Sequence, residues 1–340
     1  MTGTSLPERL DMDLLDLHDI SLLLNYERGT TEPRFRHAKL REVVTDDFKT
    51  VLLPIPQWKQ AKVPKTGFVF DKPKGYLSRA EKLEPDLVSN MLPVPIPPLL
   101  QNLNYKDLEL YYWQARNHDG CYRTVTLFQH FIDLFPSEST SIRVRFVDHN
   151  KPKTFCCSAS ARFIIEMKLY EPKSLNVSCV LPHNSTYLTG ADPVMDHAVL
   201  AFPPPPNQDE PEAILDLASL QFGEAGRGFN GKGIFVLEPV DQYMTRLNNY
   251  ARRNDFKNAK LSIRINAAPD DEFLQEVARR AKERWDKRNT EKWCQHCGAP
   301  SRHGIPLKRC AKCRVAHYCD KDHQLAAWQY HKHFCVAAEE

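Results

Sequence analysis

Residues 293–335 contain six of the ten cysteines of the chain, in pairs whose spacing suits metal binding. Eight ligand-type side chains form four successive pairs: Cys294 and Cys297, Cys310 and Cys313, Cys319 and His323, and His331 and Cys335. Two residues between cysteines let both thiolates turn onto one ion, and three residues between ligands place them on one face of a helical turn. These ligands suffice for two tetrahedral Zn²⁺ sites with no position left for water or substrate. The spacing therefore predicts two structural zinc ions, which replace the core that this segment lacks.

The order of the pairs resembles that of the MYND zinc finger. The likeness includes Tyr318 before Cys319, then Gln324, Trp328 and the run from His331 to Cys335. In that family the first and third pairs hold one ion, and the second and fourth pairs hold the other. The resemblance therefore implies two interleaved sites, the first made of Cys294, Cys297, Cys319 and His323 and the second of Cys310, Cys313, His331 and Cys335.

His323 stands where that family usually has a cysteine. An imidazole nitrogen is an equally acceptable zinc ligand, and Asp320 and Asp322 offer oxygen atoms nearby as alternatives. The other histidines of the segment are expected at the surface: His296, His303, His317 and His333.

Fingers of this family usually bind partner proteins, often through short proline-rich segments. Gln324 and Trp328 are expected on the last helix, where an aromatic face can receive a proline. Packing inside the finger is the alternative role for Trp328. Lysine methyltransferases that carry this finger are excluded, because their SET domain surrounds it and no Asn-His-Ser-Cys run is present here. We therefore expect a protein-interaction module.

A second group of reactive side chains lies in the middle of the chain. Cys121 follows a glycine at the expected start of a helix, where the helix dipole and the free amides lower the pKa of a thiol. His197 opens one expected strand, and Asp216 lies in the next one. In an unrelated domain, Cys121 would be a small residue at a helix start, His197 a hydrogen-bonded strand histidine and Asp216 a turn residue.

The order Cys121, His197 and Asp216, with "HAVLAF" and "ILDLASLQFG", resembles the transglutaminase-like (papain-like) cysteine fold. The resemblance implies a cysteine-dependent amide hydrolase or acyltransferase, in which the thiolate attacks an amide, the histidine carries the proton and the aspartate orients the imidazole. Tyr122 stands where tryptophan is common. The side chains proposed to stabilise an oxyanion are those of Gln114 and Asn117.

The elements that must position these residues indicate an α+β fold, with a central mixed helix–sheet domain and a small C-terminal double-zinc finger. Residues 117–135 predict a polar turn and an amphipathic helix, and 10–24 and 267–290 predict further helices. Strands are expected at 141–147, 161–171, 175–181, 196–202 and 212–223. The proposed division is an N-terminal helix and proline-rich region (1–104), a core domain (105–266), a connecting helix (267–290) and the finger (291–338).

Composition bounds the remaining possibilities. A hydrophobic content of 42% with 10% aromatic residues indicates a globular core, and a net charge of +3 does not by itself indicate nucleic acid or a membrane surface. Residues 279–314 hold 12 Lys or Arg and 3 Asp or Glu, but no groove-reading motif is present, which favours a solvated face over nucleic-acid binding. No apolar run is long enough to span a bilayer. The first residues lack the features of a signal peptide, so we expect an intracellular protein, in the cytoplasm or nucleus, with reduced cysteines.

Overall fold

The computed structural model describes residues 14–338 except 53–54, 76, 137–138, 207–209, 267–269 and 303–305. The strands are β1 (Leu14–Asp16), β2 (Lys39–Val44), β3 (Lys65–Asp71), β4 (Ser141–Asp148), β5 (Lys151–Ser158), β6 (Phe163–Pro172), β7 (Leu175–Leu181), β8 (Ser185–Thr189), β9 (Val194–Phe202), β10 (Ala213–Asp216), β11 (Val236–Pro239), β12 (Ala251–Asn254), β13 (Lys260–Ser262), β14 (Lys308–Arg309) and β15 (His317–Tyr318). The helices are α1 (Leu17–Thr31), α2 (Pro56–Gln60), α3 (Arg79–Leu83), α4 (Tyr105–Arg116), α5 (Gly120–Asp133), α6 (Phe229–Lys232), α7 (Val240–Tyr250), α8 (Asp271–Asp286) and α9 (Lys321–His331). The predicted α+β class is confirmed.

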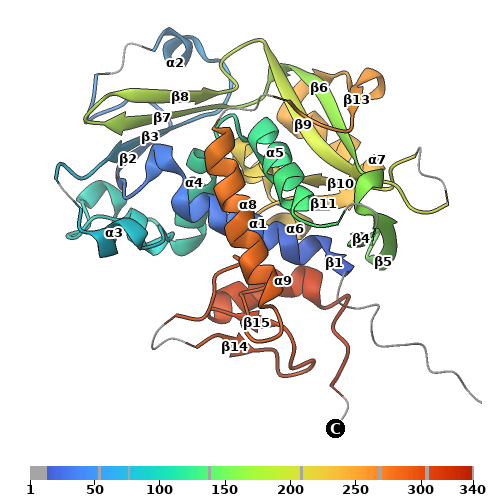
Figure 1. The fold of residues 1–340 in the computed structure, drawn as a ribbon. Coiled ribbons are helices and arrows are strands. Elements are labelled where there is room, and N and C mark those ends of the chain that lie inside the picture. Colours follow the sequence, from blue (N-terminus) through green and yellow to red (C-terminus); the bar gives the residue numbers. More distant parts are fainter. Residues whose placement is uncertain are drawn as a thin grey trace, which may run out of the picture.

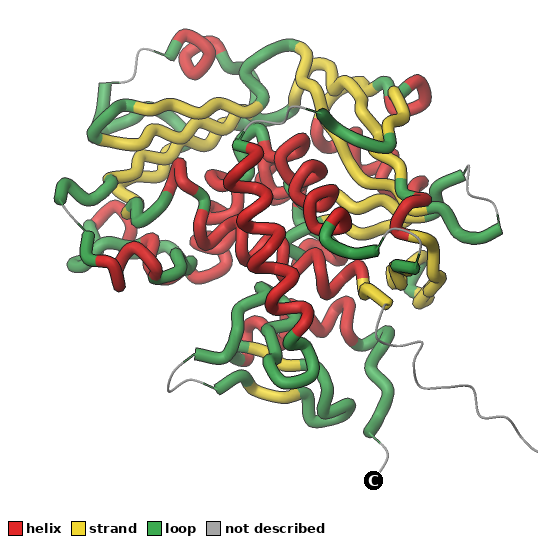
Figure 2. The backbone as a smooth tube through the Cα atoms, viewed as in Figure 1, coloured by secondary structure: helices red, strands yellow, loops and turns green. Residues whose placement is uncertain are grey.

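Two larger sheets flank a group of helices. One sheet has the order β11-β10-β9-β6-β12, with β13 also paired to β6, and the other has the order β2-β3-β7-β8. Helices α1, α4, α5 and α8 lie between the sheets, and the finger with β14, β15 and α9 lies at the bottom of the view (Figure 1). Figure 2 shows the same central group of helices in red between strands in yellow. The chain therefore places the finger directly against the helical centre of the fold.

Helix α1 is buried along nearly its whole length. Asp16 caps it by accepting a hydrogen bond from the backbone N–H of Asp19 at 3.2 Å, and the same carboxylate pairs with Arg143 at 2.9 Å and Arg145 at 2.7 Å. Polar positions such as Arg28 are buried together with the leucines. The prediction of an amphipathic helix from residue 10 is therefore corrected to a central helix that begins at Leu17, and residues 10–13 lie outside the described part.

Helix α8 is amphipathic, as the sequence predicts. Its buried face contacts α1 and α5 and consists of Leu274, Val277, Ala278, Ala281 and Trp285. Acidic residues open the helix and Arg284 lies in its last turn, in accord with the helix dipole. One hydrophobic cluster extends from Leu15 of β1 to Trp293 at the start of the finger.

The central strands differ from the predictions mainly at the end of β10, where a turn replaces the expected continuation of the strand. Strands β4, β6, β7 and β9 match the expected segments, whereas the segment 212–223 is a strand only as far as Asp216. Oδ1 of Asp216 accepts a hydrogen bond from the backbone N–H of Ala218 at 3.0 Å. This turn leads into a 3₁₀ segment, Ser219–Gly226, so a single long strand was the wrong prediction.

The segment 90–100 of the proline-rich region is anchored at both ends. Met91 and Leu100 are each 1% exposed, whereas Val94 between them is 97% exposed. The segment thus bridges over the surface between two buried apolar contacts.

Candidate metal centre and thiol site

The first cluster of zinc ligands joins residues from both ends of the finger. Sγ of Cys294 lies 3.4 Å from Nδ1 of His323, and Sγ of Cys297 lies 3.7 Å from Sγ of Cys319. The four ligand atoms all lie within 4.8 Å of one another. Asp320 caps α9 instead of joining the cluster, because its Oδ1 accepts a hydrogen bond from the backbone N–H of His323 at 2.8 Å.

The second cluster is built from the other two pairs. Sγ of Cys310 lies 4.0 Å from Sγ of Cys335, and Sγ of Cys313 lies 3.5 Å from Nε2 of His331. Again the four ligand atoms lie within 4.8 Å of one another. The interleaved grouping is the one that the family resemblance implies.

Both clusters fit tetrahedral zinc. Zinc–sulfur bonds of about 2.3 Å and zinc–nitrogen bonds of about 2.0 Å give tetrahedral edges of roughly 3.8 Å between sulfurs and roughly 3.6 Å between sulfur and nitrogen. The four separations given above, from 3.4 to 4.0 Å, agree with these edges. Three sulfurs and one imidazole nitrogen fill each site, so the chain holds two structural zinc ions with no open coordination position.

Side chains of the core orient the histidine of the first cluster. Nε2 of His323 lies 2.8 Å from the hydroxyl oxygen of Tyr105, a residue of α4. This contact leaves Nδ1 as the nitrogen that faces the cysteines. Hydrogen bonds to the free nitrogen of a ligand histidine fix the ring and strengthen metal binding. The sequence carried no spacing signal for Tyr105, because the partner lies in a distant helix.

His296 is a buried partner of the core and not the surface residue that was expected. It is 5% exposed, and its Nε2 lies 2.6 Å from Oε1 of Glu109. Arg227 donates to the other carboxylate oxygen of Glu109 at 3.0 Å. Burial raises the pKa of Glu109, but His296 and Arg227 outweigh burial and lower it to about 2. The ligand atoms of Glu109, His296 and His323 lie within 4.8 Å of one another. Because Glu109 already bonds to His296 and Arg227, we interpret this group as an ion-pair network and not as a third metal site. Of the other three histidines, His317 and His333 are half-buried and His303 lies outside the described residues.

The finger packs tightly on the rest of the fold. Gly298 has φ +76°, and a Cβ there would lie 2.4 Å from the carbonyl oxygen of Leu22 in α1. The side chain of Arg284 donates to the carbonyl oxygen of Gly298 at 2.6 Å, and the hydroxyl of Tyr330 donates to the carbonyl oxygen of Arg145 at 2.8 Å. The finger is therefore a docked part of the molecule.

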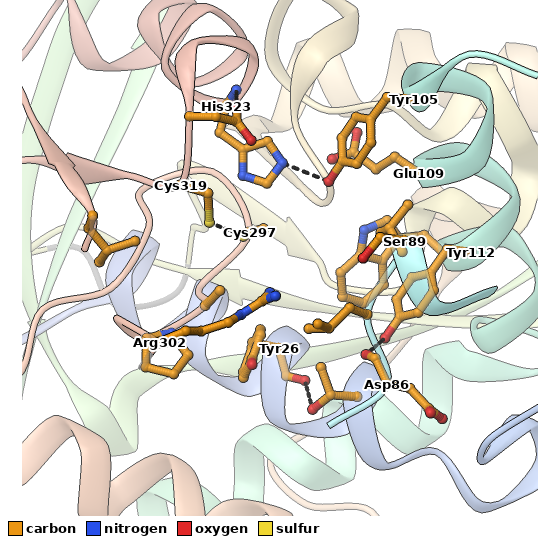
Figure 3. Close-up of a pocket in the computed structure, with 18 residues that line it drawn as sticks. Tyr26, Asp86, Ser89, Tyr105, Glu109, Tyr112, Cys297, Arg302, Cys319 and His323 are labelled. Atoms are coloured by element: carbon orange, nitrogen blue, oxygen red, sulfur yellow. Dashed lines mark hydrogen bonds between the residues drawn. The ribbon is translucent and has the colours of Figure 1, made fainter. Parts of the chain in front are cut away.

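A cavity of about 360 Å³ lies between the finger and the core (Figure 3). Tyr26, Tyr105 and Tyr112 line it from α1 and α4, and Arg302 lines it from the finger. His323 borders the same cavity, so the first zinc site lies next to this aromatic wall.

The outer face of α9 carries two exposed apolar side chains. Leu325 is 56% exposed and Trp328 is 36% exposed, three positions apart on the helix. The ring centroid of Trp328 lies 5.8 Å from that of His331. On the other side of the helix, Ala327 and His323 are buried. Trp328 therefore lies at the surface and still contacts a ligand of the second cluster.

His197 and Asp216 form a buried pair between neighbouring strands. Nε2 of His197 lies 3.2 Å from Oδ2 of Asp216, and the hydroxyl oxygen of Tyr243 lies 2.9 Å from the same nitrogen. The Tyr243 hydroxyl donates to Oδ2 of Asp216 at 3.1 Å. Burial lowers the pKa of His197, but Asp216 and the thiol of Cys121 outweigh burial and raise it to about 10. The imidazole is therefore protonated at neutral pH.

Cys121 joins this pair from the start of α5. It is the second residue of the helix and is 4% exposed. Its thiol donates to the carbonyl oxygen of Asp196, the residue before His197, at 3.7 Å, and it lies near enough to His197 to raise the pKa of the imidazole. Nδ1 of His197 has no hydrogen-bond partner among the described residues. The structure thus brings together the three side chains that the sequence singled out.

The proposed oxyanion donors lie elsewhere. Oδ1 of Asn117 accepts a hydrogen bond from Arg28, and the amide nitrogen of Gln114 lies 3.2 Å from the place that a Cβ on Gly223 would take. Neither is among the residues that line the cavity at Cys121, whereas Gln221 is. Gln221 was missed because the sequence placed it in a strand.

Comparison with known proteins identifies the C-terminal segment. The family model described as "MYND finger" matches residues 294–335. No curated protein and no solved structure matches the chain significantly. Among the residues that the structure describes, no helix is long and apolar enough to cross a membrane. With the matched family model and the two Cys/His clusters, residues 294–335 of this chain are a MYND zinc finger that binds two structural zinc ions.

Proposed function

We propose that the finger binds a partner protein through the outer face of α9. The observation that carries this proposal is the exposure of Leu325 and Trp328 on a helix whose other side is fixed by zinc and by the core. Apolar side chains on a rigid face are typical anchors of protein interfaces. Two structural zinc ions and the hydrogen bond of Tyr330 to Arg145 hold this face in place before a partner arrives.

The finer proposal is that the partner supplies a proline-rich segment. Extended proline-rich chains dock on aromatic surfaces because little conformational entropy remains to be lost. Trp328 offers an indole face, and Gln324, one turn earlier on α9 and half-buried, offers an amide for a backbone carbonyl of the ligand. We place this interaction inside the cell, in the cytoplasm or nucleus, since all ten cysteines are free of disulfides.

An array of proline-rich peptides, probed with the zinc-loaded full chain, tests the proposal. Trp328→Ala should weaken the bound peptides at least about tenfold, the effect of losing an interface anchor, with two zinc ions retained by metal analysis. Leu261→Ala, which removes a side chain 60% exposed on β13, is the matched control. Unchanged peptide binding in both Trp328→Ala and Leu325→Ala would contradict the proposal.

A second function is proposed for the central domain, namely cysteine-dependent acyl chemistry. The observation that favours it is the convergence of Cys121, His197 and Asp216 from α5, β9 and β10. A thiolate beside a protonated imidazole is the arrangement that such chemistry requires.

The proposed reaction is amide or ester cleavage in two steps. The thiolate of Cys121 forms a bond to the carbonyl carbon, and the bond to the leaving amine or alcohol breaks as His197 gives that group its proton. Water, or a second amine, then attacks the thioester, His197 takes the proton of the attacking group, and the carbon–sulfur bond breaks. With water the products are a carboxylic acid and the amine or alcohol, and the enzyme returns to its first state.

Alkylation of the full chain by iodoacetamide, followed by mass spectrometry, tests the thiol site. Because His197 is positioned to stabilise a thiolate, iodoacetamide should modify Cys121 before the exposed Cys156 at pH 6. His197→Gln should abolish this difference. A rate at Cys121 that follows the pH dependence of Cys156 in the unmodified chain would contradict the proposal.

A further inference from the structure

A second cavity of about 360 Å³ opens at the thiol site. Cys121 and Gln221 both line it, together with the loop between β8 and β9 and the first residues of β9. This volume suits a ligand the size of an amino-acid side chain with its carbonyl group. This cavity is separate from the one between the finger and the core, because the two share no lining residue among those that the structure describes.

Gln221 has an unpartnered hydrogen-bond donor next to this cavity. The residue is 2% exposed, and its amide nitrogen has no hydrogen-bond partner among the described residues. A buried donor without a partner costs free energy, so its retention suggests a partner that arrives with a ligand.

The segment that carries Gln221 passes over the start of α5. A Cβ on Gly120 would lie 3.1 Å from Cβ of Ala218, so the two backbones are in close contact. The first amides of an α-helix lack acceptors within the helix, and the side chain of Asp119 does not cap α5. The start of α5 and the segment of Gln221 therefore lie next to each other at the cavity that Cys121 lines.

The charged side chains that line the cavity are all carboxylates. Asp119, Asp192 and Asp196 lie on its wall, and no lysine or arginine is among the described residues that line it. Burial raises the pKa of Asp119, Arg34 and Arg123 lower it, and the neighbouring Asp192 raises it again, so the net shift is upward. A wall of one charge sign attracts ligands of the opposite sign and repels those of the same sign.

We infer that this cavity binds the acyl group of a positively charged amide or ester, and that the side-chain amide of Gln221 donates a hydrogen bond to the carbonyl oxygen as it becomes an oxyanion. The inference rests on the acyl chemistry proposed above for Cys121 and adds the substrate class and the oxyanion donor. Asp119, Asp192 and Asp196 select the charge, and Gln221 acts only when the carbonyl carbon becomes tetrahedral.

Two reactions of the same thiol separate the role of Gln221 from the reactivity of Cys121. Acylation by the p-nitrophenyl ester of an Nα-acyl lysine passes through an oxyanion, whereas alkylation by iodoacetamide does not. Gln221→Met should slow acylation of Cys121 about 10²- to 10³-fold, as loss of one oxyanion donor does, and leave alkylation unchanged. Gln221→Glu, which keeps the shape of the side chain, should give the same split.

The charge of the acyl group is tested with the matching glutamate ester. Acylation by the lysine ester should exceed that by the glutamate ester about tenfold or more, and Asp192→Asn with Asp196→Asn should remove most of this preference. If both esters acylate Cys121 equally and the Gln221 variants acylate normally, the inference is overturned while the acyl chemistry stands. A Cys121 that neither reagent modifies would overturn both.

Discussion

The finger and the thiol site are both made of cysteine and histidine, but they are assembled in opposite ways. The finger gathers its eight ligands from residues 294–335, and a metal ion supplies the energy that holds them together. The thiol site gathers one cysteine, one histidine and one aspartate from α5, β9 and β10, and the hydrophobic core holds those elements. In the finger every ligand is used for structure, whereas in the thiol site Nδ1 of His197 has no hydrogen-bond partner among the described residues.

The two regions differ in whether the cysteine thiol remains reactive. Thiolates around zinc are fully coordinated, which suits a scaffold. A single thiol beside a protonated imidazole is not coordinated, so its sulfur keeps a free lone pair. It can react when an open cavity reaches it. The same residue types thus give a scaffold in one region and a candidate nucleophile in the other.

Removal of zinc should produce the largest difference between the two regions. Zinc contributes about 10–16 kcal/mol to the folding of small zinc-binding units, so a chelator should abolish amide protection in residues 294–335 and leave β6, β9 and β10 protected. Hydrogen exchange of the full chain measures this effect. Cys310→Ser should halve the zinc content, and retained protection of the finger without metal would contradict the structural role of zinc.

The sequence predicted the finger almost completely because its constraints are local. The spacing of Cys294 and Cys297 or of Cys310 and Cys313 is itself the signal for metal binding. The interleaving of the pairs came from the family resemblance, since spacing alone allows other pairings. The docking of the finger was not predictable, because Tyr105 and Glu109 belong to a helix about 200 residues away.

The thiol site was predictable in part. A cysteine at a helix start and polar residues in two apolar strands indicated Cys121, His197 and Asp216. Their burial and the role of Tyr243 depend on how α7 covers the sheet, which no local pattern encodes. Gln221 escaped prediction because the hydrogen bond from the Ala218 amide to Asp216 ends the strand early.

Truncation of Asp216 should give the next largest effect. Asp216→Ala leaves His197 buried and without its carboxylate, and a broken buried ion pair costs about 3–5 kcal/mol. Urea unfolding measures this loss in the free energy of unfolding. The control is Asp271→Ala, because Asp271 pairs with His130 at 2.7 Å at the surface, and such pairs contribute about 0–1 kcal/mol. Equal losses in the two variants would contradict the burial of the thiol site.

The stability contributed by His197 should depend on pH in a fixed direction. Its pKa in the folded protein is raised to about 10, above the value of about 6.5 in an unfolded chain. The contribution is therefore fully present below about pH 6.5 and is lost as the pH rises through about 10. Urea unfolding of the unmodified chain and of His197→Gln should show a difference of a few kcal/mol at pH 6 that shrinks toward pH 10. A difference that grows with pH would show that His197 is neutral in the folded protein.

Loss of the Tyr105 hydroxyl should give the smallest effect, confined to the finger. Tyr105→Phe removes the hydrogen bond to His323 and should weaken zinc binding at the first site about tenfold, or about 1.4 kcal/mol. Competition with a chelator measures the affinity, and the second site should be unaffected. Tyr111→Phe, a change on the same helix at a half-buried residue, is the control. Equal affinities in both variants would show that the hydroxyl does not orient His323.

The contrast between a metal-held scaffold and a reactive thiol is tested most directly by a cysteine alkylation map of the zinc-loaded full chain at pH 6. We expect that Cys121 reacts before Cys156, that the six finger cysteines are protected, and that a chelator exposes those six without changing the rate at Cys121. A Cys121 that reacts more slowly than Cys156, or finger cysteines that react equally with and without zinc, would contradict it.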